Sequence, residues 1–194
     1  MTKVFYVCSY GGCGSFMLCK ALKKYGKVYH IHSRNPPDKL QHIGGPKCYE
    51  EWFNGENVSE NELSNYHVIY LYKNPVKSII SRFRNPQHLK HIQTDTTTKI
   101  EDVINTSSDA YGIKEFYNNY TQTNKKRNYN ILCVKYEEIF EKQDELSKSL
   151  DIGSLGLIKK ETNATLSDFN IDKLNEIYKD INEAMVINDF ILIR

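Results

Sequence analysis

A glycine-rich turn near the start of the chain constrains the fold more than any other feature. Residues 4–7 form a short apolar run of strand-forming residues, and three of the four positions from Gly11 to Gly14 are glycine. Apolar residues then recur at helical spacing from Ser15 to Tyr25. This order predicts a strand, a tight loop and a helix.

The loop has the composition of an anion-binding site. Glycine lets a backbone approach a ligand closely, and Ser15 stands where a hydroxyl can cap the following helix. Unpaired amide hydrogens at the start of a helix, with the positive end of its dipole behind them, attract phosphate. The sequence therefore predicts a phosphate-binding loop, and the alternative is a strand-to-helix turn that holds no ligand.

Two well-known phosphate loops require a residue that this loop lacks. The nucleoside-triphosphate loop GxxxxGK[ST] has a lysine before its hydroxyl residue, whereas Gly14 precedes Ser15 here, which disfavours an ordinary ATPase or kinase. The spacing of Cys8 and Cys13 resembles the nucleophile loop of low-molecular-weight tyrosine phosphatases, which place an arginine after the second cysteine. Because Gly14 stands there instead, the guanidinium that would hold the phosphoryl oxygens is missing. A cysteine phosphatase is therefore kept only as a further alternative.

Length, charge and cysteine content limit the class of protein. The chain has 194 residues, and we expect one domain over residues 1–194 with a sheet covered on both faces. Charged residues make up 26% of the chain and the net charge is +2, which indicates neither nucleic acid nor a membrane as a partner. Five cysteines without a signal peptide predict a cytoplasmic protein with reduced thiols. The spacing of cysteines and histidines indicates no metal site, and the oligomeric state stays open.

Strand and helix patterns alternate along the rest of the chain. The predicted strands cover residues 4–7, 27–31, 67–72, 131–134 and 190–193. The predicted helices cover residues 15–25, 76–84, 110–124, a segment ending at residue 150, and residues 171–185. A polar segment, residues 85–108, is the best candidate for a mobile or substrate-facing loop. This alternation predicts a three-layer α/β fold with a central, mainly parallel sheet and helices on both faces.

Two histidines follow each other at the end of the second predicted strand. Ligands bind at the carboxyl ends of the strands in an open α/β sheet, and alternation places His30 and His32 on the same face there. An imidazole titrates near the pH at which a general base is useful. Each histidine is a candidate base, and the alternative for each is a structural hydrogen bond at a strand end.

The segment from Lys73 to Phe83 resembles the 3′-phosphate-binding motif of sulfotransferases that use 3′-phosphoadenosine 5′-phosphosulfate (PAPS). In that motif a basic residue ends a strand, Asn-Pro or Asp-Pro follows, and a serine lies eight positions after the basic residue. Lys73 and Ser81 match in type and spacing. A cation at a strand end and a hydroxyl a little over two helical turns later can close around one phosphate.

Other segments resemble the same family in the same order. Residues 10–18 look like its 5′-phosphosulfate loop, His32 occupies the place of its histidine base, and residues 134–138 look like its Val-x-Tyr-Glu-Asp strand end. A weaker similarity continues to residue 165. The resemblance implies a fold like that of the P-loop nucleotide hydrolases.

The resemblance also implies an activity and a set of site residues. The chain would move a sulfuryl group from PAPS, as co-substrate, to a hydroxyl or amine acceptor, without a metal. His32 would take the acceptor proton, and Lys73 and Ser81 would bind the 3′-phosphate. The residues implied to bind the 5′-phosphate through their backbone amides are Gly11, Gly12, Cys13, Gly14, Ser15 and Phe16.

The chain departs from the family at one charged position. The family's first loop usually carries a lysine or arginine two residues before its conserved glycine, where it stabilises the leaving phosphate, and Gly12 stands there. Lys20, Arg34 or Arg82 would have to supply that charge, and the late Arg-Lys-Gly segment of the family has only Lys159–Lys160 as a loose match. The alternative function is therefore a sulfotransferase-fold protein that binds a nucleotide or a partner without catalysis.

Overall fold

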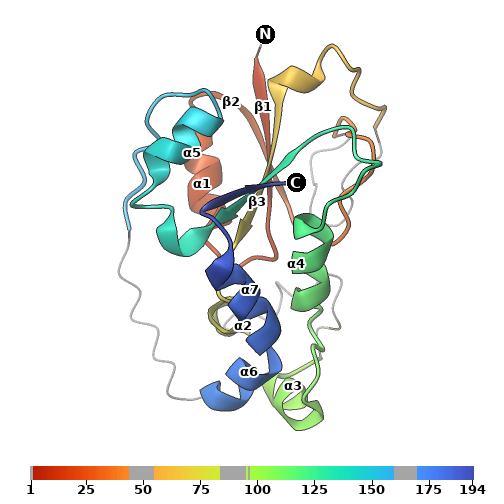
Figure 1. Ribbon diagram of the computed structural model, residues 1–194, viewed down its shortest axis with the longest axis vertical. Coiled ribbons are helices and arrows are strands. Elements are labelled where there is room, and N and C mark those ends of the chain that lie inside the picture. The colour runs from red at the N-terminus through yellow and green to blue at the C-terminus, as the bar shows by residue number, and fades with distance from the viewer. Residues whose placement is uncertain (1, 44–54, 84–94, 96, 160–169) are drawn as a thin grey trace.

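A five-stranded sheet lies at the centre of the computed structural model (Figure 1), which describes residues 2–43, 55–83, 95, 97–159 and 170–194. The strand order is β2-β1-β3-β4-β5, in which the first four strands are parallel and β5 pairs antiparallel with β4. The strands are β1 (Lys3–Cys8), β2 (Gly26–Ile31), β3 (Tyr66–Tyr72), β4 (Ile131–Lys135) and β5 (Ile191–Ile193). All five strands therefore form at the predicted places.

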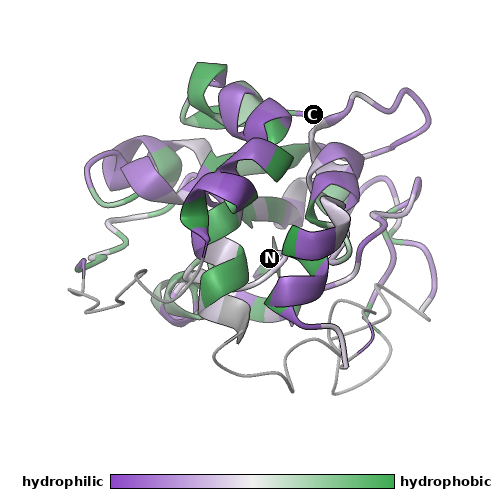
Figure 2. Ribbon diagram, turned by 90° about the horizontal axis from the view of Figure 1, so that it is seen from below, coloured by the Kyte–Doolittle hydropathy of each residue, from purple (hydrophilic) through white to green (hydrophobic). Residues whose placement is uncertain are grey.

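Helices cover both faces of this sheet. Their bounds are α1 (Ser15–Leu22), α2 (Pro75–Phe83), α3 (Ile100–Thr106), α4 (Ile113–Thr121), α5 (Gln143–Ser149), α6 (Ile171–Ile177) and α7 (Lys179–Ile187), with 3₁₀ turns η1 (Leu63–Asn65) and η3 (Tyr136–Glu138). The helices α1 and α5 lie on one side, and α4 and α7 on the other (Figure 1). Figure 2 shows that these helices carry both hydrophobic and hydrophilic residues, as helices that cover a sheet do.

The central strand β3 contributes to both hydrophobic cores. Ile69 and Leu71 pack with the residues of α1 and α5, whereas Tyr70 and Tyr72 point to the opposite side. The ring of Tyr70 stacks on that of Tyr120 in α4, with 4.3 Å between ring centroids. Strands buried on both faces are typical of parallel sheets with helices on both sides. The predicted three-layer α/β architecture is therefore confirmed.

Two predicted segments differ from the structure. The polar segment 85–108 contains helix α3, so the prediction of a loop is wrong at its end: Ile100 and Val103 are buried, and Asp102 accepts a hydrogen bond from the Lys99 amide. The earlier part of that segment, at 85–94 and 96, lies outside the described residues. The predicted helix 171–185 is divided into α6 and α7 at Tyr178, whose buried side chain donates to Asp109. None of the helices described is long and apolar enough to cross a membrane.

Candidate functional site

The glycine loop connects β1 to α1 with an unusual backbone. The φ angles of Gly11, Gly12 and Gly14 are 103°, 69° and 78°, values that side chains other than glycine rarely adopt. The loop therefore needs glycine at these three positions. The amides of Met17 and Leu18 donate to the Gly14 carbonyl, and no side chain caps α1 at Gly14. The amides of Ser15 and Phe16, which precede them at the start of the helix, are the kind of group that binds an anion.

Ser15 does not cap the helix, which corrects the expectation from the sequence. It is the first residue of α1, one position later than a cap, and its hydroxyl is directed to the neighbouring strand. The Oγ of Ser15 accepts a hydrogen bond from Ser9 Oγ at 2.9 Å and lies 2.8 Å from His30 Nε2. Ser15 can therefore offer its backbone amide to a ligand, but its hydroxyl is used inside the protein.

The second strand-loop-helix unit, β3 to α2, lies against this loop. Asn74 Oδ1 accepts a hydrogen bond from the Lys77 amide at 3.0 Å, which caps α2, and Pro75 is the first residue of the helix. A Cβ atom on Gly12 would lie 3.2 Å from the Cβ of Ser81. The loop and Ser81 are therefore neighbours, although nearly 70 positions separate them in the sequence.

Lys73 lies at the carboxyl end of β3, above an aromatic ring that also contacts the glycine loop. Its Nζ is 4.8 Å from the ring centroid of Tyr136, which gives a cation–π contact. The same ring packs on Gly14, where a Cβ would lie 2.5 Å from Tyr136 Cε2. Burial lowers the pKa of Lys73, because removal of water disfavours the charged amine. The loop, Lys73 and η3 therefore meet at one edge of the sheet.

The turn that carries Lys73 is held by two side chains from later elements. Glu137 Oε1 accepts a hydrogen bond from the Asn74 amide at 2.9 Å, and Asn182 Oδ1 in α7 accepts one from Asn74 Nδ2 at 2.8 Å. Glu137 belongs to residues 134–138, which the sequence analysis had marked for their resemblance to a strand end of the family. Asn182 was missed, because it lies in a helix beyond the resemblance and no local pattern marks it.

His32 follows β2 and is buried, with 6% of its surface exposed. Its Nδ1 lies 2.7 Å from the carbonyl oxygen of Ser9. A carbonyl can only accept, so Nδ1 carries the hydrogen and Nε2 is the basic nitrogen of the neutral ring. The ring of His30 lies 4.4 Å from that of His32, which confirms that both histidines share one face of the strand.

The comparison with protein families is consistent with this geometry. The model of the sulfotransferase domain matches residues 28–152, which is more than half of the chain. The chain belongs to the sulfotransferase family. No curated protein and no solved structure matches it. The matched region contains His32, Lys73 and Ser81, whereas the glycine loop precedes it.

Two of the cations considered as replacements for the missing loop charge of this sulfotransferase have other partners. Arg34 forms an ion pair with Glu115 in α4, with 2.6 Å between Nη1 and Oε2. Lys20 lies over the ring of Phe16, 4.6 Å from its centroid. The side chain of Arg82 lies outside the described part of the structure, and so does Lys160. Lys73, in contrast, lies over the ring of Tyr136, which also packs on Gly14 of the glycine loop.

The structure excludes the cysteine phosphatase alternative. Cys8 is fully buried in β1, and burial raises its pKa well above the ordinary value for a thiol. The Cys13 thiol donates to the carbonyl of Leu71 at 3.2 Å. A catalytic cysteine must be accessible and must ionise near neutral pH, so neither thiol of the loop is suited to attack a phosphate.

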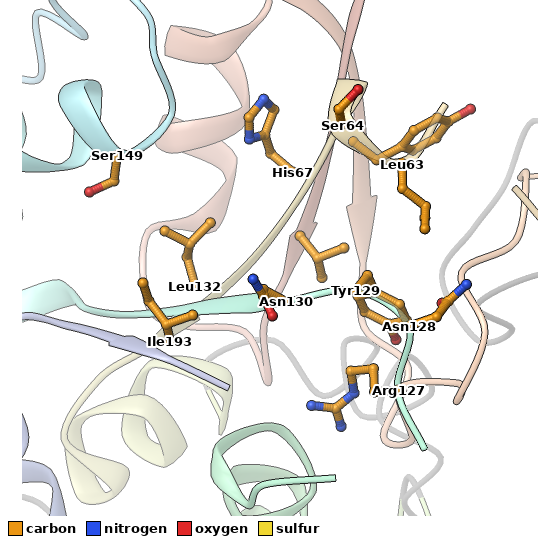
Figure 3. A pocket seen from close by; sticks show the side chains of 12 residues that line it. Leu63, Ser64, His67, Arg127, Asn128, Tyr129, Asn130, Leu132, Ser149 and Ile193 are labelled. Carbon is orange, nitrogen blue, oxygen red and sulfur yellow. The ribbon is translucent and has the colours of Figure 1, made fainter. Parts of the chain in front are cut away.

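A separate pocket of about 570 Å³ lies at the other end of the sheet (Figure 3). It is lined at the amino ends of β3 and β4 by His67, Arg127 and Tyr129, among others. Because ligands of open α/β sheets bind at the carboxyl ends of the strands, this pocket is not the predicted sulfotransferase site. Among the described residues, no cluster of three His, Cys, Asp or Glu side chains is placed to hold a metal ion.

The first prediction concerns the space at Gly12. A Cβ there would lie 2.7 Å from the Ser78 carbonyl oxygen at a positive φ, so Gly12→Ala should lower the free energy of unfolding by about 2–4 kcal/mol. Gly156 has a φ of 64° with nothing within 4 Å of its Cβ position, and Gly156→Ala should cost only about 1 kcal/mol. Denaturant unfolding of both variants measures the difference. Equal losses would show that steric contact does not keep a side chain out of position 12.

Proposed function

We propose that this sulfotransferase uses PAPS as donor and transfers its sulfuryl group to a hydroxyl or amine acceptor. One observation carries the proposal: the glycine loop packs directly against the residues that resemble the 3′-phosphate motif. Gly12 lies against Ser81, and Gly14 lies against the ring of Tyr136, over which the Lys73 amine lies. A donor with phosphates at both its 5′ and 3′ positions matches this pair of anion sites.

The two anion sites use different groups. The amides of residues 11–16 and the dipole of α1 hold the 5′-phosphosulfate, with Ser15 contributing its amide and not its hydroxyl. Lys73 and Ser81 hold the 3′-phosphate. Lys73 is half-buried and Ser81 is exposed, so a phosphate bound between them gains a desolvated cation on one side and an accessible hydroxyl on the other.

His32 removes the proton from the acceptor. Its Nδ1–H is fixed on the Ser9 carbonyl, so Nε2 takes the proton while the acceptor oxygen or nitrogen attacks the sulfur. The bond between sulfur and the 5′-phosphate oxygen breaks, and its electron pair leaves with 3′-phosphoadenosine 5′-phosphate (PAP). The amides of the loop stabilise the negative charge on this leaving phosphate.

A second candidate function is supported by Gly12. The loop lacks a cation at this position, and the packing against Ser78 leaves no space for one. A protein that binds the nucleotide without efficient transfer would show the same geometry. Sulfate transfer from PAPS to a panel of phenols and amines separates the two functions, because PAP binding is common to both.

Thermal denaturation with PAP and with AMP tests the proposed donor. PAP carries the 3′-phosphate that AMP lacks, so PAP should raise the melting temperature at concentrations where AMP has little effect. Equal shifts with both nucleotides would overturn the assignment of a 3′-phosphate site. No shift with either nucleotide would overturn PAPS as the donor.

Lys73 is expected to distinguish these two nucleotides. Lys73→Ala should weaken PAP binding at least tenfold, because a charge-assisted contact to the 3′-phosphate is lost, and should leave AMP binding unchanged. Lys77 is exposed, lies four positions later in the first turn of α2 and has the same charge. Lys77→Ala therefore controls for the change in net charge. Titration calorimetry gives both affinities, and a similar loss of PAP binding in the two variants would contradict the specific role of Lys73.

The cap of α2 gives a related prediction. Asn74→Ala removes the helix cap and the side-chain contact with Asn182 that helps to hold the Lys73 turn, so it should lower stability by about 1–2 kcal/mol and also weaken PAP binding. Asn170 caps α6 in the same way by accepting from the Lys173 amide at 3.1 Å. Asn170→Ala should have a similar stability cost without affecting PAP. If both variants bind PAP equally well, the turn is not part of the nucleotide site.

The role of His32 predicts a change in rate and not in affinity. His32→Ala should lower the transfer rate by about a hundredfold or more, since the general base is lost, while the affinity for PAP stays within twofold. His42 bonds to the Tyr66 hydroxyl at 2.9 Å, and His42→Ala serves as the control. Steady-state kinetics with PAPS and calorimetry with PAP measure the two effects. A loss of PAP affinity in His32→Ala would instead assign this histidine to the phosphate site.

A further inference from the structure

Four polar residues form a continuous series of hydrogen bonds at the base of the glycine loop. Ser9 Oγ donates to Ser15 Oγ at 2.9 Å, and Ser15 Oγ lies 2.8 Å from His30 Nε2. The carbonyl of Ser9 accepts from His32 Nδ1 at 2.7 Å. Ser9, Ser15 and His32 are buried, with 0%, 4% and 6% of their surfaces exposed. Three of the four residues are therefore buried beneath the loop, and His30 is half-buried.

This series of hydrogen bonds joins the two ends of the glycine loop. Ser9 directly follows β1, and Ser15 begins α1, so the bond between their hydroxyls spans the segment with three glycines at positive φ. Glycine gives a loop more conformational freedom than any other residue, and that freedom must be lost when the loop holds a ligand. A bond across its ends reduces this cost before the ligand arrives.

His30 completes the series from the adjacent strand β2. A hydroxyl has one hydrogen, and the hydrogen of Ser9 is already used on Ser15. Ser15 can then donate its own hydrogen to Nε2 of a neutral His30. The hydroxyl hydrogens of Ser9 and Ser15 are thus both used within this series of hydrogen bonds, and His30 fixes the orientation of the Ser15 hydrogen.

We propose that His30 is a positioning residue for the donor: it acts through Ser15 to hold the glycine loop in the shape that binds the 5′-phosphosulfate. The inference rests on the proposed function, because the ligand of the loop is taken to be PAPS. It goes beyond that function in giving His30 a role separate from that of His32. His32 acts on the acceptor, whereas His30 acts on the loop without touching either substrate.

A double-mutant cycle on the affinity for PAP tests this role. His30→Met fills similar space and offers only the weak acceptor of a thioether sulfur, and Ser15→Ala removes the hydroxyl through which His30 acts. Each single change should weaken PAP binding by about three- to tenfold, and the double variant should bind no more weakly than Ser15→Ala alone. Titration calorimetry on protein that is folded by circular dichroism gives the four dissociation constants.

His30→Gln is the matched rescue variant. Its side-chain amide oxygen can accept the Ser15 hydrogen near the position of Nε2, so it should bind PAP within twofold of the wild-type protein. A role of His30 in packing alone would not be restored by glutamine in preference to methionine. Comparison of these two variants therefore separates positioning of the loop from general stability.

The outcomes distinguish this inference from the proposed function. If the wild-type protein binds PAP and His30→Met binds it equally well, the positioning role is overturned and the proposed donor is not. Losses that multiply in the double variant would also overturn it, because His30 would then act without Ser15. Failure of the wild-type protein to bind PAP would overturn both.

Discussion

The close contact between the glycine loop and helix α2 is the interaction on which the rest of the site depends. Gly12 at positive φ lies so near the Ser78 carbonyl and Ser81 that a side chain has no space. This contact places the glycine loop next to Ser81, which comes from a distant part of the sequence, so the two proposed anion sites adjoin each other. It also explains the missing loop cation: at this separation, the packing that joins the two sites excludes a lysine or arginine from position 12.

The charge of the site is consequently concentrated in a few groups. Lys73 is partly desolvated beside Tyr136, and a desolvated charge interacts more strongly with a phosphate than an exposed one. Arg34 follows the strand that carries the histidines, but Glu115 holds it against α4. Backbone amides and the dipole of α1 provide the remaining positive potential, which is why a chain with a net charge of only +2 can form such a site.

Local patterns predicted the strands, the glycine loop and the shared face of His30 and His32, whereas Lys73 and Ser81 were indicated by the resemblance to a family motif. These features depend on residues that are close in sequence. The partner of the Ser15 hydroxyl lies on the next strand, and Asn182 reaches Asn74 from 108 positions away, so no local period could show either contact. The break at Tyr178 likewise depends on Asp109, which is distant in the sequence. Sequence patterns thus gave the elements, and tertiary contacts decided which side chains the site uses.

The order of the strands arranges the proposed reaction along one edge of the sheet. The strand β1, whose loop we propose to hold the phosphosulfate, lies between β2, which leads to His32, and β3, which Lys73 follows. The acceptor is therefore expected on the β2 side and the nucleotide on the β3 side, with the sulfur between them. Ser9 lies at the centre of this arrangement, because its carbonyl orients His32 and its hydroxyl closes the loop through Ser15. A shift of the loop must then also move the carbonyl that orients His32, so the proposed donor binding and the proposed proton removal would depend on the same backbone.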